Sequence, residues 1–267
     1  MSGRISWSWE TRGEKNLPPL VLLHGFAGSR RTWDELLPTL TKSFHCVLVD
    51  LPGHGETPRL AHPLSLWELA DKLGNLIADK FGSAFVCGYS MGGRAALHLA
   101  LQIPETMRGL ALLGASPGIA DNNERAARRK ADQELAVNIR ERGTKWFADY
   151  WSNLPLFATQ KQLPLVKQDA LRRARESCDA EGLAFALENF GTGEQDYLLP
   201  RLAELHCPLL LLAGALDGKF CALNMEMEIA AGSRKVQRVE IPNAGHAAHI
   251  ENPAAVAAEL MAFFRNL

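Results

Sequence analysis

The chain has 267 residues and nearly balanced charge, with 29 Lys and Arg against 30 Asp and Glu. This length suits one large α/β domain, or a domain with an inserted segment, and it can bury a sizeable core. A formal net charge of -1 gives no electrostatic reason to expect nucleic acid or an anionic membrane as a partner.

The sequence also lacks the signals of a membrane or secreted protein. No apolar run approaches the roughly 20 residues that a bilayer crossing needs, and the start of the chain has no signal-peptide core. The five cysteines include no Cys-x-x-Cys pair, which favours buried free thiols over disulfides or a metal site. We therefore expect a soluble cytoplasmic protein, a monomer or weak homo-oligomer, without a metal or other cofactor.

Strands and helices alternate in the first part of the chain. Strands are predicted over 5–10, Pro19–Leu23 and His45–Val49, and a helix over Leu66–Phe81 with Ser65 as its N-cap. A further strand is predicted over 109–114. The second and third strands end in glycine-containing loops, HGFAG and DLPGHG, on the side where open parallel sheets place their sites.

Residues 87–94, Cys-Gly-Tyr-Ser-Met-Gly-Gly-Arg, carry the strongest functional signal. An apolar run over 84–87 predicts a strand before this stretch, and a helix-forming run over 95–101 predicts a helix after it. Gly-x-Ser-x-Gly between a strand and a helix places a serine on a sharp turn, where Gly88 and Gly92 lack side chains that would collide. The five-residue pattern arises by chance, but its context makes Ser90 a candidate nucleophile or base.

The pattern changes after residue 117, because no convincing strand occurs from about 118 to 195. Helices are predicted there over 120–142, 144–151, 160–178 and 181–190. Alternation resumes with a strand over 208–213, a helix over 221–231, a strand over 235–241 and a closing helix over Pro253–Phe264. The pattern indicates a mostly parallel sheet flanked by helices, built from residues 1–116 and 196–267, with a helical lid over 117–195 inserted in it.

A serine hydroxyl is a weak nucleophile or base unless an imidazole takes its proton and a carboxylate orients that imidazole. Asp217 and His246 each follow a strand, in Ala-Gly-Ala-Leu-Asp and Pro-Asn-Ala-Gly-His, as Ser90 does. Two residues compete with them. Asp196 precedes a strand rather than following one, and His249 could cap a helix or touch substrate. No His, Asp or Glu spacing predicts a metal site.

These stretches resemble the α/β-hydrolase fold family across both halves of the core. The matching residues are His24-Gly25-Phe26, residues 50–55, residues 88–92, Asp217 and Gly245-His246. The resemblance implies that Ser90, Asp217 and His246 form a catalytic triad in the order Ser…Asp…His. It also implies an oxyanion hole formed by the backbone N–H groups of Phe26 and Met91, each stabilising developing negative charge by roughly 3 kcal/mol.

Arg94 bears on the substrate, because it lies one helical turn after Ser90 and its side chain can lean back toward the serine. An unpaired guanidinium in that crowded position would be costly. An anionic substrate would satisfy it, and so would a salt bridge to a lid carboxylate.

The lid contains two clusters of arginines. Such clusters are commonly solvated faces, although arginine is also the preferred residue for bidentate carboxylate binding. The members are Arg125, Arg128 and Arg129 on one helix, and Arg172, Arg173 and Arg175 on another. With Arg94, they point to a small anionic substrate.

A closer resemblance spans nearly the whole chain. Its matching segments are residues 88–94, Ser-Pro-Gly-Ile at 116–119, the arginine-rich helix from Glu124, residues 147–151 and 155–157, Asp-Gly-Lys-Phe at 217–220 and Gly-His-Ala-Ala-His at 245–249. These segments are similar to the 2-succinyl-6-hydroxy-2,4-cyclohexadiene-1-carboxylate synthases of menaquinone biosynthesis. This implies a carbon–oxygen lyase that abstracts a proton from 2-succinyl-5-enolpyruvyl-6-hydroxy-3-cyclohexene-1-carboxylate and expels pyruvate. Ser90 would then act as a base.

That resemblance also implies substrate-binding residues. Arg94, Arg128 and Arg175 match the family's carboxylate-binding arginines, and Tyr89 matches the tyrosine before the serine. Two placements stay open. The family's lid tryptophan corresponds to Trp151 or Tyr150, and Arg172 or Arg173 could take the place of Arg175 if the helix register shifts. The competing functions are a serine hydrolase acting on an ester or carbon–carbon bond of a small carboxylic acid, and a non-catalytic ligand-binding protein.

Overall fold

The computed structural model describes residues 5–232 and 236–267, which form a seven-stranded sheet at the centre of the molecule. The strand order is β1-β3-β2-β4-β5-β6-β7; β1 is antiparallel to β3, and all other neighbours run parallel. The predicted mostly parallel sheet is therefore confirmed. Its strands are β1 (Trp9–Arg12), β2 (Pro19–Leu23), β3 (His45–Val49), β4 (Ala84–Tyr89), β5 (Met107–Leu113), β6 (Leu209–Gly214) and β7 (Val236–Ile241).

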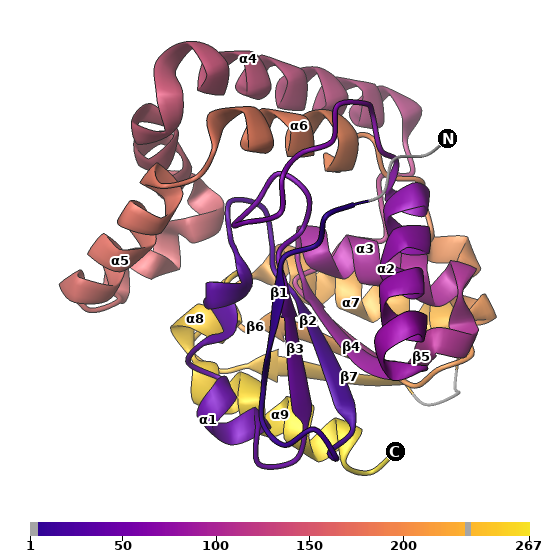
Figure 1. Ribbon diagram of the computed structural model, residues 1–267. Helices are drawn as coiled ribbons and strands as arrows, with labels where there is room; N and C mark the ends of the chain where they lie inside the picture. Colours follow the sequence, from indigo (N-terminus) through magenta and orange to yellow (C-terminus); the bar gives the residue numbers. More distant parts are fainter. Residues whose placement is uncertain (1–4, 233–235) are drawn as a thin grey trace.

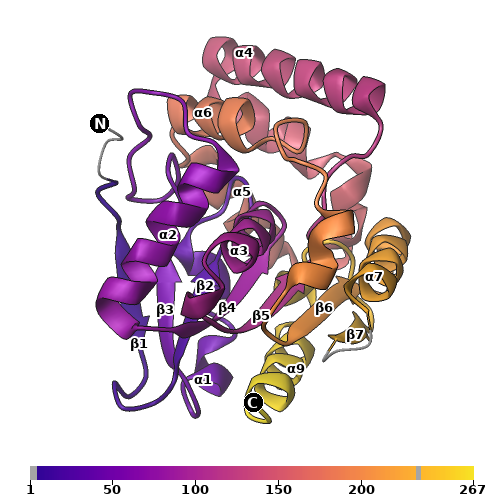
Figure 2. The same cartoon turned by 90° about the vertical axis from the view of Figure 1, so that its right-hand side faces the viewer.

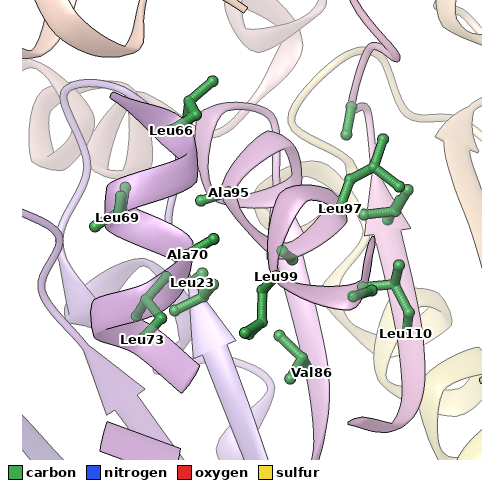
Figure 3. Close-up of a cluster of buried hydrophobic side chains, with 14 of the residues drawn as sticks. Leu23, Leu66, Leu69, Ala70, Leu73, Val86, Ala95, Leu97, Leu99 and Leu110 are labelled. Atoms are coloured by element: carbon green, nitrogen blue, oxygen red, sulfur yellow. The ribbon is translucent and has the colours of Figure 1, made fainter. Parts of the chain in front are cut away.

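Helices cover both faces of the sheet (Figures 1 and 2). On one face lie α2 (Leu66–Phe81), α3 (Met91–Gln102) and α7 (Gly218–Ala231); on the other lie α1 (Leu37–Leu40) and α9 (Pro253–Phe264). Alternate side chains of β2 enter the two cores, since successive strand residues point to opposite faces. Figure 3 shows the first core, where Leu23, Val86 and Leu110 of the strands meet leucines of α2 and α3.

Between β5 and β6 the chain leaves the sheet and forms a helical insertion. It consists of α4 (Asn122–Ser152), the 3-10 helix η3 (Pro155–Gln162), α5 (Leu165–Glu176) and α6 (Ala180–Phe190). In Figure 1, α4 and α6 form a separate layer beyond one end of the sheet. Gly143 has φ 77° and bends α4 at the predicted break between two helices. Within the described ranges, none of the helices has the length and apolar character that a bilayer crossing requires.

The structure differs from the predicted elements in a few places. The edge strand begins at Trp9 and not at residue 5, because only Trp9–Arg12 pair with β3. The helix predicted over 160–178 is interrupted at Pro164, which forces the preceding Leu163 into an extended conformation (ψ 155°), so α5 starts at Leu165. Lys235 of the predicted last strand lies outside the described residues.

Short elements were not predicted, because segments of three to six residues are too short to show a period. They are α1, α8 (Ala248–Glu251) and the 3-10 helices η1 (Arg30–Trp33), η2 (Pro104–Thr106) and η4 (Leu199–Glu204).

Candidate active site

Ser90 occupies the sharp turn between β4 and α3. Its backbone has φ 49° and ψ -110°, a conformation that costs a non-glycine residue on the order of 1–3 kcal/mol. The turn is possible because its glycines leave no room for side chains. A Cβ on Gly88 would overlap the backbone of Gly92, and a Cβ on Gly92 would overlap the carbonyl of Leu23. The predicted steric role of both glycines is therefore confirmed.

Three side chains meet at this turn from separate loops. His246 Nε2 lies 3.3 Å from Ser90 Oγ, and His246 Nδ1 lies 2.9 Å from Asp217 Oδ2. The carboxylate at Nδ1 favours the tautomer with a proton on Nδ1, which leaves Nε2 free to take the hydroxyl proton. The histidine and the aspartate are buried, so this electrostatic contact is shielded from water.

The two competing residues lie elsewhere. Asp196 accepts a hydrogen bond from Trp67 Nε1 at 2.8 Å. His249 is fully buried, with ring centroids 5.0 Å from Trp33 and 4.2 Å from Tyr89, and burial lowers its pKa to about 3. The structure thus brings Asp217 and His246 to Ser90, while His249 packs behind Tyr89.

A cavity of about 630 Å³ opens beside this group. It reaches Tyr89, which precedes Ser90, and Ala247, which follows His246. Its lining includes aromatic and polar side chains from the core and from the helical insertion, among them Phe26, Tyr89, Trp151, Phe157, Gln160 and Arg175. Burial raises the pKa of the Tyr89 hydroxyl, which therefore stays protonated and can donate or accept a hydrogen bond.

The structure distinguishes the alternatives for the aromatic residue of the insertion. The ring of Trp151 lies 5.1 Å from that of Phe26 on the cavity wall. Tyr150 is instead 43% exposed and stacks on Trp146 with ring centroids 5.2 Å apart. Trp151 is therefore the residue placed to contact a molecule in the cavity.

Arg175 brings a positive charge to the same wall. Its side chain is buried, and it donates to Ser152 Oγ at 2.6 Å and to Gln160 Oε1 at 2.8 Å. These partners are neutral, and burial lowers the pKa of the guanidinium. Since the hydrogen-bond partners of this cation within the described part of the chain are neutral, a carboxylate entering the cavity would gain a strong charge-assisted contact there.

A family model described as alpha/beta hydrolase fold matches residues 18–253. The chain belongs to the α/β-hydrolase fold family. Within that family it is 34% identical to a putative 2-succinyl-6-hydroxy-2,4-cyclohexadiene-1-carboxylate synthase of Bacillus subtilis (strain 168), over 95% of this chain and 92% of the relative. The fold and such relatives support an enzyme.

Solved α/β-hydrolase fold structures agree with this assignment. MenH from S. aureus superposes with a TM-score of 0.91 at 31% identity, covering 97% of this chain and 98% of that one. A thermophilic esterase from Thermogutta terrifontis, solved with malate bound, has a TM-score of 0.83 at 26% identity and covers 98% of this chain and 94% of its own.

Arg94 and Arg128 are placed differently from Arg175 on this hydrolase fold. Among the described residues, the cavity wall includes neither of them. The Arg94 guanidinium donates to the carbonyl oxygen of Phe190, so its partner is a backbone group of the insertion and not the carboxylate considered above. Burial, and after it the charge of the nearby Arg128, lower its pKa to about 10. Arg128 itself pairs with Asp132, one turn along α4, at 2.9 Å.

Two further arginines of the clusters pair with acidic side chains near the surface, whereas Arg125 donates to Asn122 Oδ1 at 2.9 Å. Arg129 pairs with Glu194 at 2.6 Å, and Arg172 pairs with Asp149 at 3.3 Å and Glu176 at 3.1 Å. Of the cluster at 172–175, Arg175 is thus the member that reaches the cavity.

Sequence reasoning missed Gln160, whose amide oxygen fixes the guanidinium of Arg175. A 3-10 helix gives no sequence period that could have marked it. Over residues 5–232 and 236–267, His, Cys, Asp and Glu side chains nowhere gather in a group of three that could hold a metal ion.

Proposed function

We propose that this chain is a carbon–oxygen lyase that eliminates pyruvate from 2-succinyl-5-enolpyruvyl-6-hydroxy-3-cyclohexene-1-carboxylate to give 2-succinyl-6-hydroxy-2,4-cyclohexadiene-1-carboxylate. The observation that carries the proposal is the group of Ser90, His246 and Asp217 beside a cavity with a buried cation. Similarity to synthases of that name over 95% of the chain supports the same reaction. The reaction belongs to menaquinone biosynthesis.

The substrate and product names define the bonds that change. The proton leaves C2, the enolpyruvyl oxygen leaves C5, and the ring double bond at C3 becomes a diene at C2 and C4. The C2 proton lies next to the ketone of the succinyl group, so its removal places negative charge on that ketone oxygen. A base at C2 and hydrogen-bond donors at the ketone are therefore what the reaction requires.

The candidate site offers these groups. Ser90 Oγ gives its proton to His246 Nε2 and takes the C2 proton, while Asp217 stabilises the imidazolium. The backbone N–H of Met91, the first residue of α3, has no acceptor within its helix, and with that of Phe26 it holds the enolate oxygen. The electrons return to the ring, the C5–O bond breaks, and the departing pyruvate enolate is protonated at carbon, while the His246 imidazolium gives up its Nε2 proton and returns to the neutral form.

Binding of the substrate's carboxylates falls first to Arg175, with Tyr89 and Trp151 against the ring and its substituents. We propose Arg94 and Arg128 as ligands of the remaining carboxylates. For this, the substrate must displace the carbonyl of Phe190 from Arg94 and Asp132 from Arg128.

Pyruvate release tests the proposal. The purified protein is incubated with the enolpyruvyl substrate, and pyruvate is followed by NADH oxidation with lactate dehydrogenase. The wild-type protein is expected to release one pyruvate per substrate, and the Ser90→Ala variant to show only the uncatalysed background. Release by the wild-type protein no faster than that background would overturn the proposal.

A serine hydrolase is the second candidate, favoured by the strained serine turn and by the fold likeness to an esterase. Its signature is a burst of nitrophenol from a nitrophenyl ester, followed by ester turnover faster than pyruvate release. Ligand binding that is unaffected by Ser90→Ala, without turnover of either substrate, would instead indicate a binding protein.

A further inference from the structure

The loop after β2 is held by a buried histidine whose protonation state can be assigned. His24 is fully buried, with Nε2 3.0 Å from the backbone nitrogen of Leu51 and Nδ1 2.8 Å from the carbonyl oxygen of Gly25. A backbone N–H can only donate, so Nε2 must accept from Leu51. The proton of the neutral ring is then on Nδ1, and His24 donates it to the Gly25 carbonyl.

That hydrogen bond also fixes the direction of the Phe26 N–H. The Gly25 carbonyl and the Phe26 N–H belong to one planar trans peptide, in which the two groups point in opposite directions. Holding the oxygen toward His24 therefore turns the N–H to the opposite side. The Gly28 N–H donates to the same carbonyl at 3.1 Å, which fixes the peptide from a second direction.

The same peptide lies against the serine turn. A Cβ on Gly25 would lie 2.7 Å from the ring of Tyr89 and 3.4 Å from the Cβ of Ser90. Gly25 has an ordinary φ, so this close approach is what excludes a side chain there. The peptide that carries the Phe26 N–H thus lies close to Tyr89 and to the candidate catalytic residue Ser90.

A second buried histidine takes the next N–H of the loop. Ala27, at φ 58°, donates to His54 Nε2 at 3.1 Å, and His54 Nδ1 lies 3.3 Å from the carbonyl of Pro52. Two successive N–H groups of the loop therefore differ: that of Ala27 donates to His54, whereas that of Phe26 has no acceptor among residues 5–232 and 236–267 and can donate to a ligand.

We infer that His24 is a positioning residue of the oxyanion hole. Its imidazole N–H holds the Gly25 carbonyl, aims the Phe26 N–H at the oxygen that takes up negative charge, and polarises that peptide so that it donates more strongly. The inference rests on the proposed role of Phe26, but it is independent of which substrate carries the oxygen.

Two amide variants separate this role from simple loop support. The amide nitrogen of asparagine is bonded to Cγ, as Nδ1 is, and can donate in its place, whereas the amide oxygen of glutamine lies one atom further out, as Nε2 does, and can accept in its place. His24→Asn should keep the donor to Gly25 and lose the acceptor for Leu51; His24→Gln should keep the acceptor and lose the donor. We expect kcat to fall less than about fivefold in His24→Asn and about 50-fold or more in His24→Gln, with KM changing little. Equal losses, or the reverse ranking, would overturn the inference.

Two measurements keep this test independent of the lyase reaction and of variant folding. Phenylboronic acid adds to a serine oxygen, whose proton passes to the histidine, and the resulting tetrahedral boronate places a hydroxyl in the oxyanion hole. By calorimetry its Kd should rise more in His24→Gln than in His24→Asn, even if the wild-type protein releases no pyruvate. Nitrogen-15 spectra of the wild-type protein should show His24 protonated at Nδ1; a dominant Nε2–H tautomer would contradict the inference.

Discussion

The loops of the sheet and the helical insertion contribute to one cavity by different means. In the core, short loops with glycines at close contacts fix Ser90, His246 and the Phe26 peptide through the backbone. In the insertion, long arginine side chains project from helices, and their packing decides whether they reach the cavity. The contrast teaches that the main chain sets the geometry of the candidate triad, whereas the packing of side chains decides which charges face the cavity.

The largest effect is expected from a substitution in the core that removes catalysis and leaves substrate binding at the insertion in place. Ser90→Ala should lower kcat by about a thousandfold or more, because the hydroxyl that relays the proton is removed. It should leave the Kd of the substrate within a few-fold, since Arg175, Tyr89 and Trp151 remain in place. Stopped-flow or calorimetric binding beside steady-state kinetics would measure both. Similar kinetics in Ser90→Ala and the wild-type protein would refute the assignment.

The candidate triad could be located from the sequence because its neighbours are governed by local rules. Parallel strands place their carboxyl ends at one edge of the sheet, so loops after successive strands meet there whatever their sequence separation. The glycines around Ser90, and the glycine before His246, indicated the loops in which the chain packs too closely for a side chain. The β7 strand and the His246 loop followed from the same alternation.

The directions of the insertion's arginines could not be obtained in this way. A helical period shows which residues share a face, but not what that face packs against. The pairing of Arg128 with Asp132 follows the i, i+4 rule and was accessible from the sequence. The contact of Arg94 with the Phe190 carbonyl depends on how α6 docks beside α3, and the Pro164 break moved Arg175 onto a shorter helix than expected.

Acid pH should destabilise the core through protonation of its buried histidines, a residue type that the insertion lacks. All eight histidines lie outside residues 117–195. Burial lowers the pKa of His24 and His98 to about 4, and of His54 and His249 to about 3. An unfolded histidine has a pKa of about 6.5, so the unfolded chain binds more protons below that value. The contribution of these histidines to stability is therefore full well above pH 6.5 and is lost as pH falls toward 4.

By this linkage, each of the four histidines should lower the free energy of unfolding by about 1 kcal/mol between pH 6.5 and 5.5. Urea unfolding at pH 7.5, 6.5 and 5.5 would measure the slope, with a drop of about 1.4 kcal/mol over the first interval and of about 4 kcal/mol over the second. The exposed His206 supplies the control, because His206→Gln should leave the slope unchanged. An unfolding free energy that stays flat down to pH 5.5 would mean that these rings are not kept neutral by burial.

The smallest effect distinguishes the cavity arginine from its exposed neighbour on the same helix. Arg175→Gln should raise KM about 10- to 50-fold while kcat falls less than about threefold, because a buried charge-assisted contact to a substrate carboxylate is lost in ground and transition state alike. Arg172→Gln, whose side chain is half exposed and pairs with Asp149 and Glu176, should change KM less than about twofold. Steady-state pyruvate release measures both variants. Equal effects in the two would mean that α5 acts on the substrate through its overall charge, and the distinction between a cavity-lining and a solvent-facing arginine would fail.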